Sequence, residues 1–452
     1  DLKMFDIDEI GKYFPANNSP RIKNYKVNLS SEVVSKITYS LPPSSTAVQR
    51  QILSIPSIKE IEDVVIDSQT STRSYAKKKT QTTPYSPYDF KQSSEIPLER
   101  KPIISYDTQL QTANLKEKPQ FKDLKIVGSA AVFNRKFIGI RRTIKHPLSI
   151  VTLNEEIPIE EDPNIKEIAK TESEMPLRVF STVKALAAIA VCQRSVYPFD
   201  LHFKKEGKDV YVIVGNNSPA EVETTLETIT TTASVQRDRM TLEFLENIPE
   251  TCKVNESFIQ KCVEGQEKIK LGDDSDTPYL YRSIIVGGIE FVIRARIDSL
   301  SEEPKEGEPI KPLVCRVFND IPTQLRVNEW NKLEDKRGTI FIGETNANSA
   351  KVGRWVTIAN LIGASKLMIG YAVRKASTIK EPHVLLGVEQ HTTEKISRDI
   401  SLLQGNIYGV LTIIFSRLQT AADGKYLFTR DSKQKKTYSI YSLDASNAES
   451  AE

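Results

Sequence analysis

The sequence predicts a mixed α+β domain that follows a long, poorly structured N-terminal arm. Apolar residues are unevenly spread over the 452 residues, because Ser, Thr, Pro, Lys and Tyr dominate the first hundred. From about Ile103 onward, β-prone runs and helical segments are mixed along the chain, which is the order of an α+β or mixed α/β domain. We therefore expect an arm over residues 1–102 and a single domain over residues 103–443, without internal repeats.

Composition and cysteine spacing exclude several classes of protein. The four cysteines, Cys192, Cys252, Cys262 and Cys315, lie far apart and form no C-x-x-C pair, so neither a zinc site nor a disulfide framework is indicated. No apolar run approaches the roughly 20 residues that span a bilayer. The net charge of +3 is too small to indicate nucleic-acid binding by itself. We expect a cytoplasmic protein with no membrane contact, in which any contact with RNA is local.

The arm contains the most polar stretch of the chain. Residues 68–94 have almost no aliphatic side chain to offset the entropy of ordering them, which favours a solvated linker. The alternative is a contact with RNA or with a partner protein, since aromatic and basic side chains alternate here. These side chains are Arg73, Tyr75, Lys77, Lys78, Lys79, Tyr85, Tyr88 and Phe90.

The first half of the domain begins with a helix that starts at Asp162-Pro163. The alanine-rich run from Met175 to Cys192 is apolar on most faces and predicts one buried helix. Two β-prone runs from Tyr197 to Val214, with Gly207 between them, predict a hairpin. The polar, threonine-rich residues 218–239 are interpreted as an inserted loop.

The middle of the domain contains another hairpin signal. The runs Tyr279 to Val286 and Ile289 to Asp298 are β-prone and are joined by Gly287-Gly288, which suits a two-residue turn. We also expect a strand from Thr339 to Gly343. A helix follows that Asn346 caps and that ends near Ile362, with Gly363 just beyond it.

The last part of the domain predicts four strands and a helix. Leu367 to Arg374 and His383 to Gln390 are interpreted as strands, and Ser397 to Thr420 as one long helix. Lys425 to Arg430 and Lys436 to Ser442 predict the final hairpin. Residues 444–452 form a short polar tail.

No motif of catalysis or cofactor binding occurs in the sequence. It lacks a Walker-type loop, a dinucleotide-binding glycine pattern, a nucleophile elbow and H-E-x-x-H. None of the four histidines, His146, His202, His383 and His391, has a second His at metal-ligand spacing. The acidic run from Gly272 to Asp276 lacks the ligand pattern of an EF-hand and predicts a solvated turn. We expect no catalytic residue, no cofactor and no metal.

Several short motifs carry a resemblance that extends from about residue 120 to residue 443. In these motifs, which are dispersed but occur in the same order along the chain, the sequence resembles the D subunit of eukaryotic translation initiation factor three. They are Arg194-Ser195-Val196-Tyr197, Asn328-Glu329-Trp330, Lys336-Arg337-Gly338, the run from Ala350 to Trp355, the run from Leu367 to Tyr371, the run from His383 to Gly387, and the run from Gly424 to Leu427.

The resemblance implies a cup-shaped α/β domain related in fold to the decapping exonucleases. In this family the domain can hold the 5′ cap of certain messenger RNAs. The N-terminal arm of the family binds the E subunit of the same factor, at the mRNA exit side of the small ribosomal subunit. The partners implied are therefore the other subunits of the factor, the small ribosomal subunit and mRNA.

The resemblance also implies candidate cap contacts. The family's cap contacts correspond here to Val183, Val196, Tyr197, Cys252, Asn255 and Glu256. Val196, Tyr197 and Asn255 agree with the family pattern. Val183 stands where an Asp is expected, Cys252 where a Thr is expected, and Glu256 where a His is expected. Losing the Asp removes a partner of the cationic base and adding the Glu repels phosphate, so these substitutions argue against cap binding. Tyr197 either stacks on a base or packs between elements.

The related decapping enzymes hold a divalent metal through Glu-hydrophobic-Asp and Glu-hydrophobic-Lys strands. The corresponding strands here are Arg296-Ile297-Asp298 and Arg316-Val317-Phe318. Two cations stand where anionic ligands are needed, so the resemblance implies that Mg²⁺ and the nuclease chemistry are absent.

Three hypotheses of function follow from the resemblance. The first is a scaffold and mRNA-contacting subunit of the initiation factor, and the second is an active cap-processing hydrolase of the same fold. The third is a scaffold without any cap recognition, which differs from the first only in the site residues. Arg135, Lys136, Arg141, Arg142 and Lys145 are candidates for general contacts with RNA phosphate, with a solvated strand end as the alternative for Arg141 and Arg142.

Overall fold

The computed structural model describes residues 102–106, 108–140, 146–149, 151, 156–194, 199–213, 253–320, 341–342, 345, 349–374, 383–430 and 437–444. All of them belong to one compact unit, residues 83–452. Most of the arm, the loop at 218–239 and most of the tail lie outside the described residues, so their expected roles remain predictions. No helix in the described part is long and apolar enough to cross a membrane.

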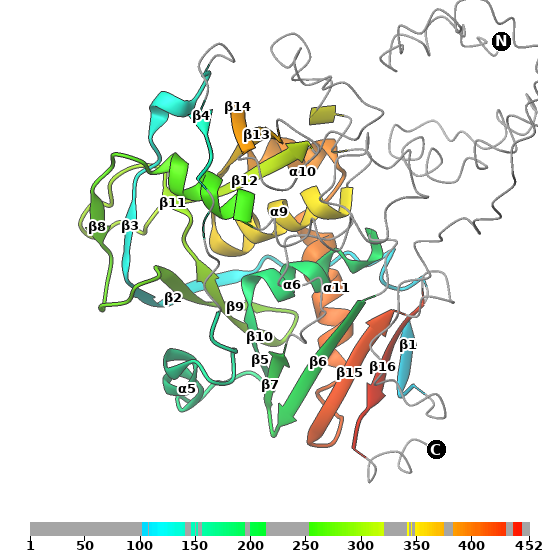
Figure 1. Cartoon of the computed structure of the whole chain (residues 1–452). Coiled ribbons are helices and arrows are strands. Elements are labelled where there is room, and N and C mark those ends of the chain that lie inside the picture. Colours follow the sequence, from blue (N-terminus) through cyan, green and yellow to red (C-terminus); the bar gives the residue numbers. More distant parts are fainter. Residues whose placement is uncertain are drawn as a thin grey trace, which may run out of the picture. The chain divides into compact units, whose positions relative to one another are not determined.

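The larger of the two main sheets is mixed and has nine strands (Figure 1). β5 pairs in parallel with both β7 and β10, whereas the neighbouring hairpins are antiparallel. In sheet order the strands are β1 (Ile104–Tyr106), β16 (Tyr438–Ser442), β15 (Gly424–Arg430), β6 (Phe199–Glu206), β7 (Asp209–Ile213), β5 (Leu177–Thr182), β10 (Ile289–Arg296), β9 (Tyr279–Val286) and β2 (Gln120–Val127).

The second main sheet has five strands, and a small third sheet has two. β12 and β13 of the five-stranded sheet run parallel, and β13 pairs antiparallel with β14. In sheet order its strands are β11 (Ser299–Leu300), β12 (Pro312–Asp320), β13 (Lys366–Arg374), β14 (His383–Thr392) and β4 (His146–Pro147). The small sheet pairs β3 (Ser129–Ala131) with β8 (Lys268–Lys270).

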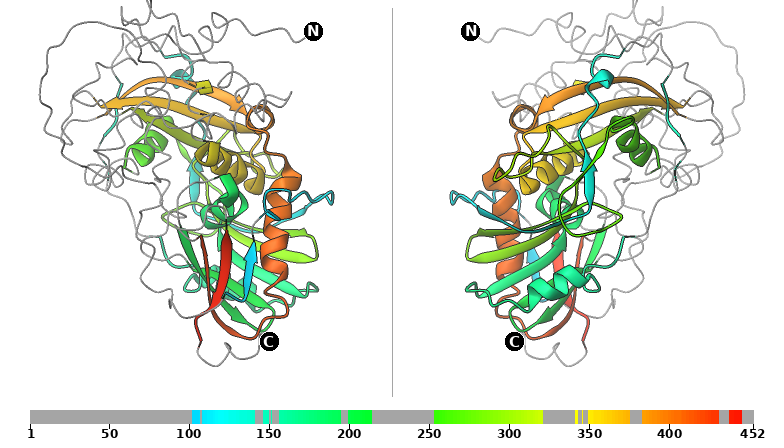
Figure 2. Two further views of the ribbon diagram at one scale, coloured as in Figure 1. Left: turned by 90° about the vertical axis from the view of Figure 1, so that its right-hand side faces the viewer. Right: turned by 90° about the vertical axis from the view of Figure 1, so that its left-hand side faces the viewer.

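Helices lie between the two main sheets, as both views of Figure 2 show. α6 (Val183–Ala190) packs on β5 and β10, α9 (Ser349–Ile362) packs on β12 and β13, and α6 also contacts α9 and α11 (Gln404–Ser416). Apolar side chains of both sheets and all three helices form one buried core. The mixed α+β class is therefore confirmed.

The run from Met175 to Cys192 is not one helix, and this prediction was wrong. Residues 177–182 form β5, in which all six residues are buried between β7 and β10. Thr182 then accepts a hydrogen bond from the backbone of Ala185 and so caps α6, while η4 (Cys192–Arg194) ends the segment. A strand buried on both faces is as continuously apolar as a buried helix, so the sequence pattern could not separate them.

The segment from Ser397 to Thr420 was expected as one helix and contains a break. α10 (Thr393–Asp399) ends before α11 begins at Gln404, and Ser401 between them has a φ of 52°. Arg194 donates two hydrogen bonds of 2.8 Å, one to the carbonyl of Ile400 and one to that of Ser401. A distant guanidinium therefore satisfies carbonyl groups that the break leaves outside a helix.

The strand expected from Thr339 to Gly343 is also wrong for the residues that the structure describes. Phe341 and Ile342 are helical. Phe341 is buried and stacks on the imidazole of His391, with 4.3 Å between the ring centroids. Tertiary packing of one aromatic side chain outweighs the β-propensity of this short run.

The remaining predictions for described elements are confirmed. β6–β7, β9–β10 and β15–β16 are antiparallel hairpins, and Gly287 and Gly288 have φ values of 60° and 72° in the tight turn. α5 (Pro163–Ala169) begins after Asp162, whose carboxylate accepts hydrogen bonds from two backbone N–H groups. α9 ends at Ile362, before Gly363 with a φ of 72°. Asn346, its expected cap, lies outside the described residues.

A helix over residues 253–262 lies against the five-stranded sheet at a glycine. Phe258 is fully buried, and a Cβ atom at Gly370 of β13 would lie 2.6 Å from its ring. Only glycine therefore permits this close approach. The contact fixes the position of the helix, whose first turn contains two of the candidate site residues.

We predict that Gly370→Ala lowers the free energy of unfolding by about 1–3 kcal/mol, because the buried ring of Phe258 has no room to move. Gly353→Ala is the matched control: its Cβ would meet its nearest neighbours at 3.5–3.6 Å, an ordinary contact, in the middle of α9. The control should be neutral or more stable by up to about 1 kcal/mol. Urea unfolding measures both, and equal stability of the two variants would contradict the packing argument.

Candidate functional site

Two parallel strands bring the candidate site together. β5 ends at Thr182 and β10 at Arg296, and Arg294 lies opposite Thr182 in the register. The carboxyl ends of parallel strands meet at the same edge of a sheet, where α/β folds commonly place polar sites. The start of α6, with Val183 and Lys184, therefore lies beside the end of β10.

Charged side chains alternate with apolar ones at the end of β10 and cross to the second sheet. Arg296 donates to the carboxylate of Glu256 at 2.6 Å and lies 3.8 Å from that of Asp298. Asp298 in turn accepts a hydrogen bond from Arg316 on β12 and one of 3.0 Å from the backbone of Cys315. Arg316 and Asp298 are almost fully buried, while about a quarter of the Arg296 side chain is exposed. We call these four side chains, Glu256, Arg296, Asp298 and Arg316, the arginine network.

A second set of ion pairs adjoins the arginine network. Lys184 at the start of α6 pairs with Glu156 at 2.9 Å, and Arg294 lies 3.7 Å from the same carboxylate. Arg294 also pairs with Asp162 at 2.9 Å, and Asp162 accepts a hydrogen bond from Tyr281. The carboxylate that caps α5 is thus tied to the interior of the nine-stranded sheet.

The pKa values of Glu156 and Arg296 are both shifted toward the charged form. Burial raises the pKa of Glu156, but Lys184, Arg294 and Arg296 outweigh it and hold the pKa below its ordinary value. Burial likewise lowers the pKa of Arg296, and the carboxylates of Asp298 and Glu256 more than compensate, so that the pKa is raised. The two sets of ion pairs therefore influence each other through Glu156 and Arg296.

Three of the candidate cap contacts are described by the structure. Asn255 accepts a hydrogen bond of 3.2 Å from the backbone of Val317, which connects the helix to β12. Glu256, one residue on, is held by Arg296. Val183 is 5% exposed and packs in the main hydrophobic core. Asn255 and Glu256 therefore contact the two strands that carry Arg316 and Arg296.

The other candidates lie outside the described residues. Val196 and Tyr197 are two and three residues after Arg194, the last residue of η4, and Cys252 precedes residue 253 in the sequence, so both segments adjoin described elements. The general RNA contacts Arg141, Arg142 and Lys145 are in the gap before β4. Arg135 and Lys136, by contrast, are described as the first two residues of η3 (Arg135–Phe137). The roles of all eleven candidates remain predictions.

Sequence reasoning missed Glu156, Lys184 and Arg294 as members of the site. A signal was present, because Arg294, Arg296 and Asp298 recur at every second position of a β-prone run, a spacing that indicates one face of a strand. β10 itself ends at Arg296. Charges on a buried strand face need partners. Their partners, however, come from segments up to about 140 residues away, such as Ile157 and Asp162 for Arg294, and no spacing rule indicates them.

The charges of the site balance one another. Four cations, Lys184, Arg294, Arg296 and Arg316, face four carboxylates, Glu156, Asp162, Glu256 and Asp298. A divalent metal does not fit at Asp298, because that carboxylate is already shared by two guanidinium groups and a backbone N–H. Nor do the described residues contain any other group of three or more His, Cys, Asp or Glu that could hold a metal ion.

The fold and the site together define an α/β domain whose polar site is built from mutually paired charges. The chain belongs to the family of eukaryotic translation initiation factor 3 subunit 7 (eIF-3), since the sequence model of that family matches residues 66–442. The resemblance to the D subunit of this factor is thereby confirmed.

Curated relatives agree with this assignment. The D subunit of eukaryotic translation initiation factor 3 from Homo sapiens is 27% identical over 350 residues, and that from Xenopus tropicalis is 28% identical over 349. The matches cover 71% of this chain in both cases, and 61% and 60% of the two relatives. The chain thus spans about three fifths of the length of the curated relatives it matches.

Among solved structures, two Rai1 proteins are similar to this chain at low sequence identity. Rai1 of Candida albicans, in complex with pU5-Mn²⁺, is 12% identical with a TM-score of 0.44, and covers 76% of this chain and 95% of its own. Rai1 of Scheffersomyces stipitis, in complex with (3′-NADP)⁺ and calcium ion, gives the same identity and TM-score and covers 76% and 94%.

We predict that Lys184→Met destabilises the protein by about 1–2 kcal/mol at pH 7, because it leaves the largely buried carboxylate of Glu156 short of a cation. In the wild type the pKa of Glu156 is held below its ordinary value of 4.5, so its contribution is complete above that pH and is lost as pH falls through the lowered pKa. The difference between wild type and variant should therefore shrink below about pH 4.5.

The control for this variant is Lys204→Met, which removes a more exposed ion pair of the same length, 2.9 Å, to Glu206. It should change stability by less than about 0.5 kcal/mol. Urea unfolding at several pH values measures both variants. A loss for Lys184→Met that is independent of pH would show that only packing was removed.

Proposed function

We propose that this chain is a non-catalytic subunit of eukaryotic translation initiation factor three that acts in the cytoplasm as a scaffold and as a contact for mRNA. The family match over residues 66–442 is the observation that carries the proposal. The domain would contact mRNA at the exit side of the small ribosomal subunit. The arm, residues 1–102, would bind the E subunit of the same factor.

The absence of catalysis is part of the proposal. Its support is the arginine network, in which Arg296 and Arg316 surround the carboxylate of Asp298. Metal-dependent hydrolysis of phosphate esters needs carboxylates that are free to bind the metal. The hypothesis of a cap-processing hydrolase is disfavoured on this ground.

Cap recognition would be weak at most in this chain. A cap combines a cationic base with a triphosphate. Val183 offers no charge to the base, and it is packed in the core. Glu256 is bound by Arg296, so it neutralises a cation that could otherwise attract phosphate. Tyr197, Val196 and Cys252 complete the proposed contact region on the segments that adjoin the site.

The assembly role predicts that the full chain co-purifies with the other subunits of initiation factor three and with small ribosomal subunits. The reason is that the family match covers the domain and part of the arm, which together would supply the contacts with these partners. The measurement is affinity purification from native lysate followed by mass spectrometry. A chain lacking residues 1–102 is the control and should lose the E subunit first. Recovery of the full chain without any of these partners at physiological salt would overturn the assignment.

Because Val183 is uncharged and Glu256 is paired with Arg296, we predict that the chain does not distinguish the cap. Capped and uncapped RNA of the same sequence should bind with dissociation constants that agree within about threefold. Losing one charged partner costs about 1.5–3 kcal/mol, and repulsion adds to this, so a micromolar cap site would fall toward millimolar. Fluorescence anisotropy with both RNAs measures the ratio. The same mixtures with Mg²⁺ or Mn²⁺ should release neither cap nor nucleotides.

Tyr197→Ala and Arg296→Gln provide the comparison for this prediction. Micromolar, cap-dependent binding that Tyr197→Ala abolishes would show that the cap site is intact. Metal-dependent release of product by the wild type would contradict the non-catalytic role. Arg296→Gln should leave both the ratio of the two dissociation constants and the absence of cleavage unchanged.

A further inference from the structure

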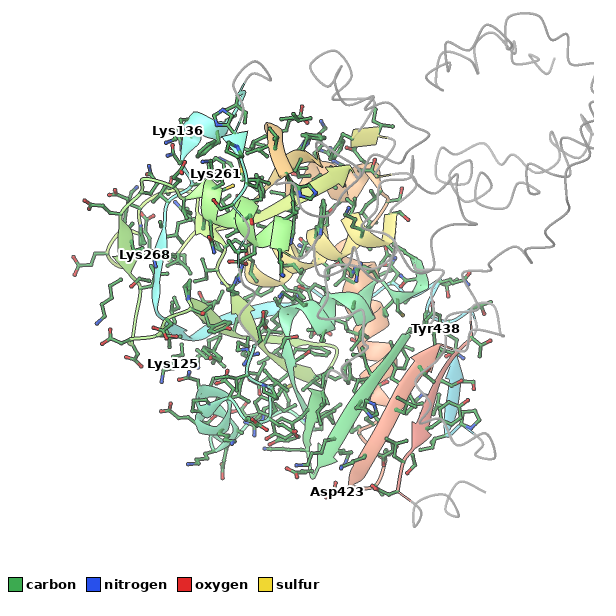
Figure 3. All side chains as sticks on the ribbon, in the orientation of Figure 1. Lys125, Lys136, Lys261, Lys268, Asp423 and Tyr438 are labelled. Carbon is green, nitrogen blue, oxygen red and sulfur yellow. The ribbon has the colours of Figure 1, made fainter. Side chains whose placement is uncertain are left out.

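A cationic surface lies at the far end of the helix that carries Asn255 and Glu256. η3 (Arg135–Phe137) places Arg135 and Lys136 in solvent and buries Phe137. Lys261, in the last turn of the helix at 253–262, and Lys136 both direct their ammonium groups to the ring of Phe137, at 5.9 and 5.2 Å from its centroid. We call Arg135, Lys136, Lys261 and Lys268 the basic corner. Figure 3 labels three of these residues on one side of the domain.

The basic corner is built on a fixed backbone. The backbone N–H of Asn134 donates to the carbonyl of Cys262 at 2.7 Å, and its side-chain amide donates to the carbonyl of Glu264 at 2.7 Å. These bonds hold η3 against the end of the helix. Lys268 on β8 lies opposite Ala131 of β3, four residues before Arg135. The four cations therefore come from three elements that are joined by hydrogen bonds.

Most cations of the corner are not neutralised by neighbouring carboxylates. Among the described residues, Arg135, Lys136 and Lys268 have no carboxylate within ion-pair distance, and Lys261 pairs with the exposed Glu264 at 2.9 Å. By contrast, Lys125 and Lys270 on the neighbouring strands each pair with a carboxylate. In the described part, three of the four cations of the corner thus have no ion-pair partner.

Two neighbouring side chains respond to this positive charge. The ring of His146 packs edge-on to Phe137 with 5.8 Å between centroids. Burial lowers the pKa of His146, and the ammonium groups of Lys261 and Lys136 lower it further, against an opposing effect of Glu264. The hydrogen bond from Lys261 and its charge lower the pKa of Glu264 itself. The corner therefore stabilises negative charge.

We propose that the basic corner binds phosphate groups of single-stranded RNA without regard to base sequence. The choice of RNA rests on the proposed function. Lys261 follows Asn255 by six residues on one helix, or about 9 Å along its axis, so one strand can reach both the corner and the arginine network. Phe137 is 1% exposed and cannot stack on a base, which leaves ionic contacts as the basis of binding.

The test uses the full chain and a fluorescein-labelled, uncapped oligouridine of about 20 nucleotides, titrated from 50 to 200 mM salt. Each phosphate contact contributes a factor of about [salt]^−0.7 for single strands. Lys136→Gln/Lys261→Gln should therefore weaken binding about 25-fold at 0.1 M salt and reduce the slope of log K against log [salt] by about 1.4.

The matched control is Lys166→Gln/Lys170→Gln, which removes two exposed lysines at α5. It should bind RNA within about twofold of wild type. Lys136→Gln/Lys268→Gln changes only exposed side chains, and serves if loss of Lys261 disturbs folding. Equal binding by the corner variants and the control would overturn the proposal.

The pKa of His146 gives a second readout, by NMR of the imidazole resonances. Bound phosphate offsets the charge of Lys136 and Lys261, so saturating RNA should raise the pKa of His146 in the wild type and in the control. An unchanged pKa at saturation would place RNA elsewhere. An oligoglutamate of equal charge distinguishes the ligand class: if it binds as tightly as RNA, the corner is a site for an acidic protein instead.

Failure of this proposal is distinct from failure of the proposed function. A corner variant that loses RNA but still co-purifies with the initiation factor supports both proposals. If the wild-type chain binds RNA through the corner but does not co-purify with the factor, the RNA-binding proposal stands and the proposed function is overturned. If the chain co-purifies with the factor but the corner variants bind RNA as tightly as wild type, only the RNA-binding proposal for the corner is overturned.

Discussion

The arrangement of the domain depends on the pairing of Asp298 with Arg296 and Arg316. These side chains connect β10 of one main sheet with β12 of the other, and two of them are almost fully buried. Removing Arg316 would leave the buried carboxylate of Asp298 with only the more distant Arg296, and breaking a buried pair in this way typically costs about 3–5 kcal/mol. The helix at residues 253–262 is bound to the same two strands, through Glu256 to Arg296 and through Asn255 to the backbone of Val317. The relative positions of the sheets and of this helix are thus set by a few ionic and polar contacts as well as by apolar packing.

This construction explains how a polar site can lie between two sheets with its charges paired among themselves. A guanidinium group takes the place that a cation would need, and it adds direction because it donates several hydrogen bonds in one plane. The two surfaces therefore differ in the ligands that they can bind. Groups that carry a single strong charge must compete with an internal partner at the arginine network, whereas the basic corner has cations that no described carboxylate neutralises. The two ends of one helix therefore differ in what they can bind.

The sequence predicted the elements that local signals determine. Asp162 before Pro163, Gly287-Gly288 and Gly363 each require a particular backbone, and the structure has a helix start, a hairpin turn and a helix end there. It failed where distant contacts decide. Residues 177–182 are a strand because β7 and β10 flank them, and the helices at 393–399 and 404–416 are separate where Arg194 binds the intervening carbonyls. Glu256 and Asn255 were identified as site residues through the resemblance. Their partners Arg296 and Val317 required the three-dimensional structure.

At one edge of the nine-stranded sheet, two strands from opposite ends of the described chain are paired. β1 pairs with β16, so that Ile104 lies opposite Ile440. Loop-closure entropy makes such non-local pairing slow, because the hydrogen bonds and apolar contacts that stabilise the pair form only after both strands are present. During synthesis, the edge formed by β15 stays open until β16 has left the ribosome, and unpaired edges are prone to association with other chains. The nine-stranded sheet is therefore completed only after β16 has been made, and a nascent chain that stalls before β16 exposes a template for aggregation.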